Sequence, residues 1–149
     1  MKKRIIFLCT HNSARSQMAE GLLRHYQGDK YDVYSAGTHP TAVHPLAVTV
    51  MAEIGIDISA QRSKGLDAFK DERFDLAITL CDGARAECPV LPGAARMEHH
   101  GFMDPDAFDG TESQKVEKFR MVRDEIRDWI MLYFADDIAP RKMGVNLGF

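Results

Sequence analysis

The sequence predicts an α/β fold with a parallel β-sheet, because short apolar segments typical of strands alternate with segments of helical periodicity. The first such segment, residues 5–8, is a continuous apolar run of the kind found in buried parallel strands. In sheets of this type, ligands bind beyond the carboxyl ends of the strands, where the strand order changes direction. We therefore expect a functional site at the end of the first strand, near Cys9.

The same patterns assign the elements in chain order. Four segments have strand character, at residues 5–8, 33–36, 76–80 and, more weakly, within 95–99. Apolar spacing predicts three helices, at residues 15–26, at residues 46–54 after Pro45, and around residues 119–133. Gly28 and Gly55 are expected to end the first two helices. Thr111 and Gln114 have the spacing of a capping box at the start of the third.

Length and charge limit the domain organisation and the partners. A chain of 149 residues fits one domain, which we assign to residues 1–138, followed by an extended or mobile tail at residues 139–149. With 45% hydrophobic and 28% charged residues, the chain is expected to fold as a soluble globule. The net charge of −3 argues against nucleic acid as a partner, since nucleic-acid binding requires a basic face.

The cysteine count and the apolar runs indicate the compartment. No apolar run is long enough to span a membrane, and the first residues lack the apolar core and cleavage site of a signal peptide. The three cysteines, Cys9, Cys81 and Cys88, are too few and odd in number for a secreted disulfide framework. We therefore expect a cytoplasmic protein whose cysteines are core residues, metal ligands or catalytic groups.

Residues 9–16 join the first strand to the first helix and read Cys-Thr-His-Asn-Ser-Ala-Arg-Ser. Small and polar residues permit a tight loop whose backbone N–H groups point inward, and the positive N-terminus of the helix adds to this anion site. Arg15 can curl back over the loop as a bidentate partner for a tetrahedral oxyanion. A thiol in this field is favoured as the thiolate, and Ser16 could donate a hydrogen bond to the sulfur of Cys9.

Cys9 could instead be an inert core residue at the end of a strand, since cysteine is often buried. The spacing of Cys9, Arg15 and Ser16 at a strand-to-helix turn favours a reactive thiolate that faces a bound oxyanion. Asn12 is better suited to bracing the loop than to chemistry, because asparagine tolerates left-handed backbone angles. His11 is expected to point outward.

Three segments together resemble a known family: CTHNSARSQMAEG at residues 9–21, YSAGT at residues 34–38, and the dipeptide Asp104-Pro105. They are similar to low-molecular-weight protein tyrosine phosphatases, and most closely to the thioredoxin-coupled arsenate reductases with that fold. The resemblance runs from about residue 3 to residue 134 and implies a four-stranded parallel sheet flanked by helices in a three-layer sandwich. It also implies that arsenate, or a phosphate-like oxyanion, is bound by Thr10, His11, Asn12, Ser13, Ala14, Arg15 and Ser16.

Cys81 and Cys88 allow several interpretations. Cys81 follows the third strand, so it should lie at the same edge of the sheet as Cys9. The pair could be structural, or it could bind zinc with His99 and His100, although the cysteines are too far apart for a usual zinc site. The resemblance implies instead that Cys81 and Cys88 are redox thiols. The segment between them would have to rearrange before the two sulfurs could form a disulfide.

The resemblance implies an arsenate reductase, an enzyme of arsenical resistance that needs no cofactor. In this scheme the Cys9 thiolate attacks arsenate, and Cys81 then attacks Cys9 and releases arsenite. Cys88 next attacks Cys81, and thioredoxin reduces the final disulfide. Two alternatives stay open: a phosphatase that hydrolyses phosphotyrosine or small phosphoesters through a phosphocysteine, and a non-enzymatic oxyanion or redox-sensing module.

Asp104 lies in a loop after the fourth predicted strand. On its own, Asp-Pro is common turn chemistry. The resemblance gives Asp104 the position of the general acid that protonates the departing oxygen. Asp106 and Asp109 are expected to be solvated.

No metal site is predicted. Some members of the family hold a monovalent cation near the loop. In this chain, Glu20 and Ser35 could help to position Asn12. Arg62 and Lys64 fall where such a site would need oxygen ligands, so we expect no bound ion.

Overall fold

Four parallel strands form the sheet in the part of the chain that the computed structural model describes, which is residues 2–81 and 89–135. The strands are β1 (Lys3–Cys9), β2 (Tyr31–Gly37), β3 (Leu76–Thr79) and β4 (Met97–His99), in the spatial order β2-β1-β3-β4. All predicted strands are present, and β1 and β2 are longer than their apolar runs suggested. The four-stranded parallel sheet expected from the sequence is confirmed.

The carboxyl ends of the strands meet at one edge of the sheet. Cys9 of β1 pairs with Gly37 of β2, and Leu8 of β1 pairs with Thr79 of β3. The chain leaves β1 toward β2 on one side and later crosses over to β3 on the other. The end of β1 is therefore the switch point at which α/β proteins bind their ligands.

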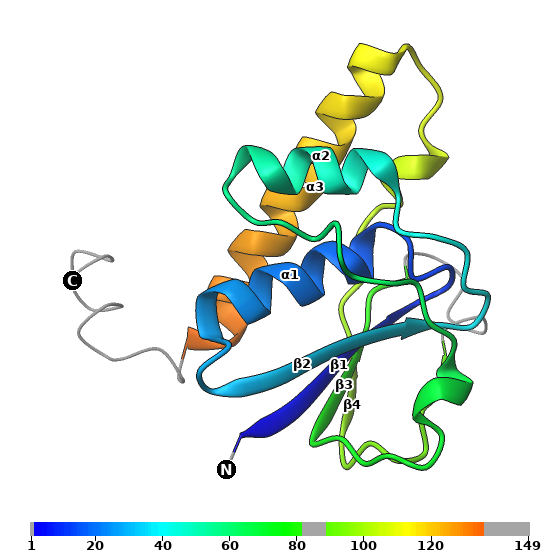
Figure 1. Cartoon of the computed structure of the whole chain (residues 1–149), viewed down its shortest axis with the longest axis vertical. Coiled ribbons are helices and arrows are strands. Elements are labelled where there is room, and N and C mark those ends of the chain that lie inside the picture. The colour runs from blue at the N-terminus through cyan, green and yellow to red at the C-terminus, as the bar shows by residue number, and fades with distance from the viewer. Residues whose placement is uncertain (1, 82–88, 136–149) are drawn as a thin grey trace.

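The α-helices of the described residues lie on one side of the sheet (Figure 1): α1 (Arg15–Gln27), α2 (Pro45–Glu53) and α3 (Glu112–Tyr133). Their apolar faces pack on strand residues such as Phe7, in a core cluster that includes Leu22 of α1 and Phe119 of α3. The 3-10 helix η1 (Leu66–Phe69) and neighbouring segments cover the other face, through a cluster of Ile6, Leu8, Ala36, Phe69, Phe74, Ala77 and Leu91. Burial on both faces explains the continuous apolar runs of the strands.

The helix ends follow local rules that the sequence carries. Thr111 and Gln114 form the predicted capping box of α3, in which each side chain accepts a hydrogen bond from the other residue's backbone N–H. α1 ends at Gly28 as predicted, where an added Cβ would lie 2.4 Å from the carbonyl oxygen of Arg24. Gly55 follows α2 with a φ of 81°, in the left-handed region that favours glycine.

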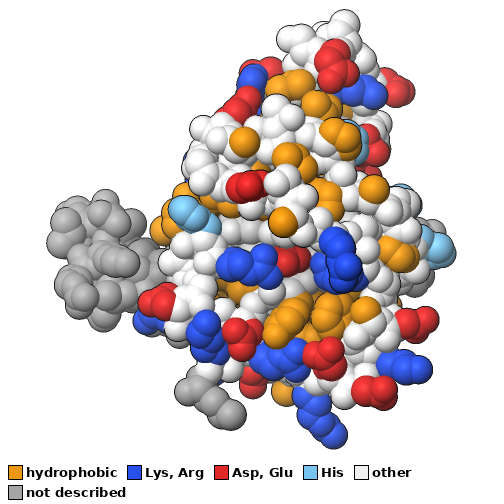
Figure 2. Space-filling view, in the orientation of Figure 1, with side chains coloured by type: hydrophobic (Ala, Val, Ile, Leu, Met, Phe, Trp, Pro, Cys, Tyr) orange, Lys and Arg blue, Asp and Glu red, His pale blue; other side chains and the backbone are white. Residues whose placement is uncertain are grey.

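The surface carries charges of both signs. Figure 2 shows acidic and basic side chains interspersed among the described atoms of one face. No helix within residues 2–81 and 89–135 is long and apolar enough to cross a membrane. The predicted tail, residues 139–149, lies outside the described residues.

Glu53 joins α2 to α3 through two arginines. Its carboxylate accepts hydrogen bonds from Arg120 Nε at 2.9 and 3.0 Å, and from Arg123 Nη1 at 2.9 Å. The hydrogen bond from Arg120, and to a smaller extent the one from Arg123, holds the pKa of Glu53 below its usual value of 4.5. A carboxylate with a lowered pKa stabilises the folded state above its unfolded pKa, and this stabilisation is lost as pH falls through the folded pKa.

The variant Glu53→Gln should therefore lower the midpoint of thermal unfolding at neutral pH by about 2–4 °C. The difference from the wild type should shrink as the pH falls below about 4.5, which thermal unfolding followed by circular dichroism can measure. Glu117→Gln removes only one exposed contact to Arg120 and should have a smaller effect at every pH. If Glu53→Gln lowered the midpoint of thermal unfolding equally at about pH 3 and at neutral pH, this role would be contradicted.

Candidate active site

The segment between β1 and α1 forms a tight loop at the switch point. β1 ends at Cys9 and α1 begins at Arg15, and the N-cap residue, Ala14, makes no side-chain capping hydrogen bond. The positive end of α1 is therefore not covered by a capping side chain and faces the loop. An uncovered helix N-terminus of this kind is suited to the anion site that the sequence predicts.

Asn12 holds the loop in shape. It has a φ of 50° and is fully buried. Its Nδ2 donates to Ser16 Oγ at 2.8 Å and to Ser35 Oγ at 2.9 Å. Its Oδ1 accepts from the backbone N–H of Lys64 at 2.8 Å and from Gln17 Nε2 at 2.9 Å. The side chain is thus bonded at both ends, as expected for a residue that braces a left-handed turn.

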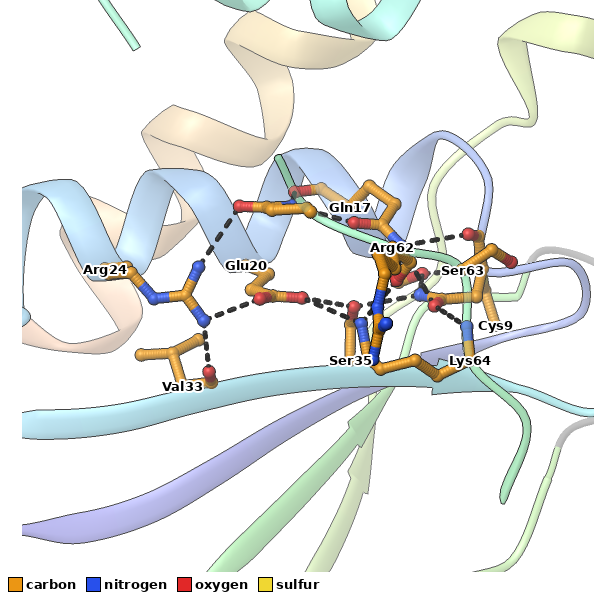
Figure 3. Close-up of polar contacts among 12 residues, drawn as sticks. Cys9, Gln17, Glu20, Arg24, Val33, Ser35, Arg62, Ser63 and Lys64 are labelled. Carbon is orange, nitrogen blue, oxygen red and sulfur yellow. Dashed lines mark hydrogen bonds and ion pairs between the residues drawn. The ribbon is translucent and has the colours of Figure 1, made fainter. Parts of the chain in front are cut away.

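A charged network that includes Glu20, Arg24 and Lys64 (Figure 3) is connected to Asn12 through Ser35. Ser35 Oγ accepts from Asn12 and donates to Glu20. Glu20 pairs with Arg24, and its Oε1 lies 3.8 Å from Lys64 Nζ. Burial lowers the pKa of Lys64, and the nearby Glu20 opposes this shift. The amine of Lys64 therefore lies inside this network, beside Glu20. In the described ranges, no group of three His, Cys, Asp or Glu side chains is arranged to hold a metal ion.

The sulfur of Cys9 is connected to Asn12 through Ser16. Cys9 is 2% exposed, and its Sγ is 2.9 Å from Ser16 Oγ. The backbone N–H of Lys64 fixes the orientation of the Asn12 amide, so Nδ2 of Asn12 is a donor and Ser16 Oγ accepts from it. The hydroxyl hydrogen of Ser16 can then be donated to the sulfur, which is the direction that stabilises a thiolate.

A cavity of about 180 Å³ opens at the mouth of the loop. It is lined by Cys9, His11, Ser13, Ala14, Arg15, Thr41, Asp104 and Asp106. Thr41 and Asp106 belong to this lining although the sequence predicted no role for them. Of the predicted substrate-binding residues, Thr10, Asn12 and Ser16 are not among those that line it. Asn12 and Ser16 are fully buried and shape the loop from within.

Arg15 and Asp104 both line this cavity and lie beside each other. Arg15 is 6% exposed, and its Nη1 donates to the carbonyl oxygens of Phe102 at 3.1 Å and Leu80 at 3.5 Å. Its Nη2 lies 3.7 Å from Asp104 Oδ2. The cavity thus holds a buried guanidinium, a carboxyl group and a thiol within one small volume, which is a suitable arrangement for displacement at a tetrahedral oxyanion.

Cys81 lies just beyond β3, at the edge where β1 also ends, and it is buried. Cys88, the other predicted redox thiol, lies outside the described residues. His99 Nδ1 is 2.8 Å from Thr79 Oγ1, whereas the ring of His100 stacks on Trp129 with centroids 4.7 Å apart. The two histidines therefore have separate partners, which does not favour a zinc site that contains both.

Similar proteins identify the family of this chain. The model of one protein family, low molecular weight phosphotyrosine protein phosphatase, matches residues 4–136. The chain belongs to this family. An arsenate reductase of Halalkalibacterium halodurans is 51% identical over 125 residues, which is 84% of this chain and 90% of that protein.

Solved structures agree with this membership in the low molecular weight phosphatase family. One described as an arsenate reductase in the phosphate binding state has a TM-score of 0.74 at 35% identity, covering 91% of this chain and 98% of that one. A thioredoxin-dependent arsenate reductase of Corynebacterium glutamicum has a TM-score of 0.57 at 29% identity, covering 89% of this chain and 63% of that one. The resemblance and the fold that the sequence motifs indicated are confirmed, and the chain is an enzyme of this family.

Gln17 and Gln61 support the loop between β1 and α1, and neither was predicted from the sequence to do so. Gln17 Nε2 donates to the carbonyl oxygen of Arg62 at 2.9 Å as well as to Asn12. Gln61 Nε2 donates to Gln17 Oε1 at 2.7 Å. Helical periodicity marks Gln17 only as a position on α1. Two of its partners, Gln61 and Arg62, lie 44 and 45 residues away, so no local pattern could reveal them.

Substitution of Asn12 tests whether its side chain shapes the anion site. Asn12→Gly permits a positive φ but removes the buried hydrogen bonds, so phosphate should bind about tenfold more weakly. Asn12→Ala adds the backbone strain of a left-handed residue, so affinity should fall by a further factor of about five. Isothermal titration with inorganic phosphate measures both, with Thr49→Ala on the exposed side of α2 as a control. Unchanged phosphate affinity in Asn12→Gly would refute this role.

Proposed function

We propose that this chain reduces arsenate to arsenite through a relay of Cys9, Cys81 and Cys88 that thioredoxin recharges. The observation that carries the proposal is a second buried thiol, Cys81, directly after the strand that pairs with the strand of Cys9. A phosphatase needs one thiol, whereas reduction of As(V) to As(III) needs two electrons, which two thiols supply. Similarity to arsenate reductases over most of the chain supports this choice.

In the first step, arsenate occupies the cavity between the loop and Arg15. The N-terminus of α1 and the guanidinium of Arg15 stabilise the negative charge of the oxyanion. The thiolate of Cys9 attacks arsenic, and Asp104 protonates the departing oxygen, which leaves as water. The backbone of residues 10–14 holds the remaining oxygens, so the product is an arsenic–sulfur adduct on Cys9.

In the second step, the thiolate of Cys81 attacks the sulfur of the adduct. The electron pair of the arsenic–sulfur bond stays with arsenic, which leaves as arsenite, and Cys9 and Cys81 form a disulfide. Cys88 then attacks Cys81, which frees Cys9 as a thiolate and forms a Cys81–Cys88 disulfide. Thioredoxin reduces this last disulfide, an assignment supported by the thioredoxin-dependent relative. A relay of this kind requires reduced thiols, which fits a cytoplasmic enzyme of arsenical resistance.

Hydrolysis of phosphotyrosine or small phosphoesters is the second candidate function. Family membership and the trio of Cys9, Arg15 and Asp104 favour it, because that trio suffices for a phosphocysteine intermediate. The same trio argues against a non-enzymatic sensing module. Many phosphatases of this family present tyrosines just after the Asp-Pro pair. Asp106 and Ala107 follow Asp104-Pro105 here, and this favours the reductase.

One comparison of rates separates the two reactions. Oxidation of NADPH by thioredoxin reductase and thioredoxin should depend on both this chain and arsenate. Hydrolysis of an aryl phosphate, measured beside it, should be slow. Fast hydrolysis without arsenate-dependent oxidation of NADPH would overturn the reductase in favour of the phosphatase.

The variant Cys88→Ser tests the order of the relay. It should release about one equivalent of arsenite per chain and then stop, because the Cys9–Cys81 disulfide can no longer be resolved. Arsenite can be quantified after rapid mixing with stoichiometric arsenate. Cys9→Ser, the control, should release none. Full turnover of Cys88→Ser with thioredoxin would show that Cys88 has no part in the reaction.

A further inference from the structure

His44 connects three segments around the oxyanion cavity. Its backbone N–H donates to the carbonyl oxygen of Ser13 in the loop, at 3.0 Å. Its side chain caps α2, because Nδ1 accepts from the N–H of Leu46 at 3.0 Å. Its Nε2 lies 2.8 Å from Oδ1 of Asp106, in the turn that carries Asp104. One residue therefore links the anion loop, a helix terminus and the turn of the expected acid.

The two ring nitrogens of His44 have different roles. Because Nδ1 accepts from a backbone N–H, the neutral ring carries its proton on Nε2 and donates it to Asp106. The ring also packs on Phe119 of α3, with centroids 4.7 Å apart. Reorientation of the ring would break the cap of α2 and this contact, so the donor at Nε2 has a fixed direction.

The turn that carries Asp104 is short and partly exposed. It is the 3-10 helix η3 (Pro105–Ala107), in which Pro105 is buried while the side chain of Asp106 is 55% exposed. Asp104 Oδ1 accepts from the backbone N–H of Asp106 at 3.0 Å, and Oδ2 faces Arg15. A shift of Asp106 would therefore carry the carboxyl group of Asp104 with it.

We infer that the side chains of His44 and Asp106 form a clasp that positions Asp104 to protonate the departing oxygen. The inference rests on the general-acid role given to Asp104 in the proposed function. His44 and Asp106 act through Asp104 and are positioning residues. A general acid must lie within hydrogen-bond reach of the atom that it protonates, and a displacement of about 1 Å can cost about a hundredfold in rate.

Aryl phosphates with different leaving groups test the clasp. The first displacement at Cys9 needs the same proton whether phosphorus or arsenic is attacked, and kcat/KM reports this step. Phenol is a poor leaving group that depends on the acid, whereas p-nitrophenol departs with little help. His44→Asn can keep the helix cap but is too short to reach Asp106. It should lower kcat/KM about tenfold for phenyl phosphate and less than about threefold for p-nitrophenyl phosphate.

A second set of variants leaves the cap of α2 intact. Asp106→Ala should show the same dependence on the leaving group as His44→Asn. Asp106→Asn keeps an oxygen that can accept from His44 and should restore most of the rate with phenyl phosphate. In an Asp104→Asn background, His44→Asn should cause no further loss, because the clasp acts through Asp104. His25→Ala, on the exposed side of α1, is the matched histidine control and should change neither rate.

Three outcomes overturn the clasp, and they have different meanings. Equal losses with both aryl phosphates, or additive losses for His44 and Asp104, would limit His44 to a structural role. An Asp104→Asn variant whose loss is independent of the leaving group would overturn the general acid and the clasp together. Arsenite release by the wild-type chain tests the proposed reduction separately, so failure of that function is distinguishable from failure of the clasp.

Discussion

The anion site depends on one buried asparagine in a left-handed conformation. Asn12 makes four side-chain hydrogen bonds, to α1, to β2 and to the backbone of Lys64. Loss of its side chain would leave buried partners unsatisfied, at about 1–3 kcal/mol each. β2 can approach this turn because Gly37 has no Cβ, which would lie 2.5 Å from the carbonyl oxygen of Thr10. The loop is therefore shaped by tertiary contacts as much as by its own residues.

The same hydrogen bonds connect the fold to the chemistry. Asn12 donates to Ser16, and Ser16 can in turn donate to the sulfur of Cys9, so the residue that braces the loop also contacts the partner of the proposed nucleophile. In the proposed reaction, Arg15 and Asp104, which also line the cavity, divide the tasks of charge stabilisation and proton transfer. Neither task distinguishes arsenate from phosphate. In the proposed relay, the reaction is set by Cys81 and Cys88, which lie outside the loop in sequence.

The sequence predicted the parts of this arrangement that local patterns encode. Apolar runs and helical spacing gave the strands and helices, and the spacing of Cys9 and Arg15 gave the anion loop, because both signals lie within a few residues. His44 was missed as a support of the site because Ser13 and Asp106, its partners there, are distant in sequence. Asp106 was expected to be merely solvated, since a half-exposed carboxylate in a turn gives no sign of its bond to His44.

A single anaerobic turnover gives the most direct test of the claim that this loop delivers oxyanions to a thiol relay. Arsenite and remaining thiols would be counted in the same sample, from a reduced chain with three cysteines and no added donor. We predict the loss of about two thiols for each arsenite, with Cys81 joined to Cys88 and Cys9 open to alkylation. Retention of all thiols after exposure to arsenate would contradict the relay.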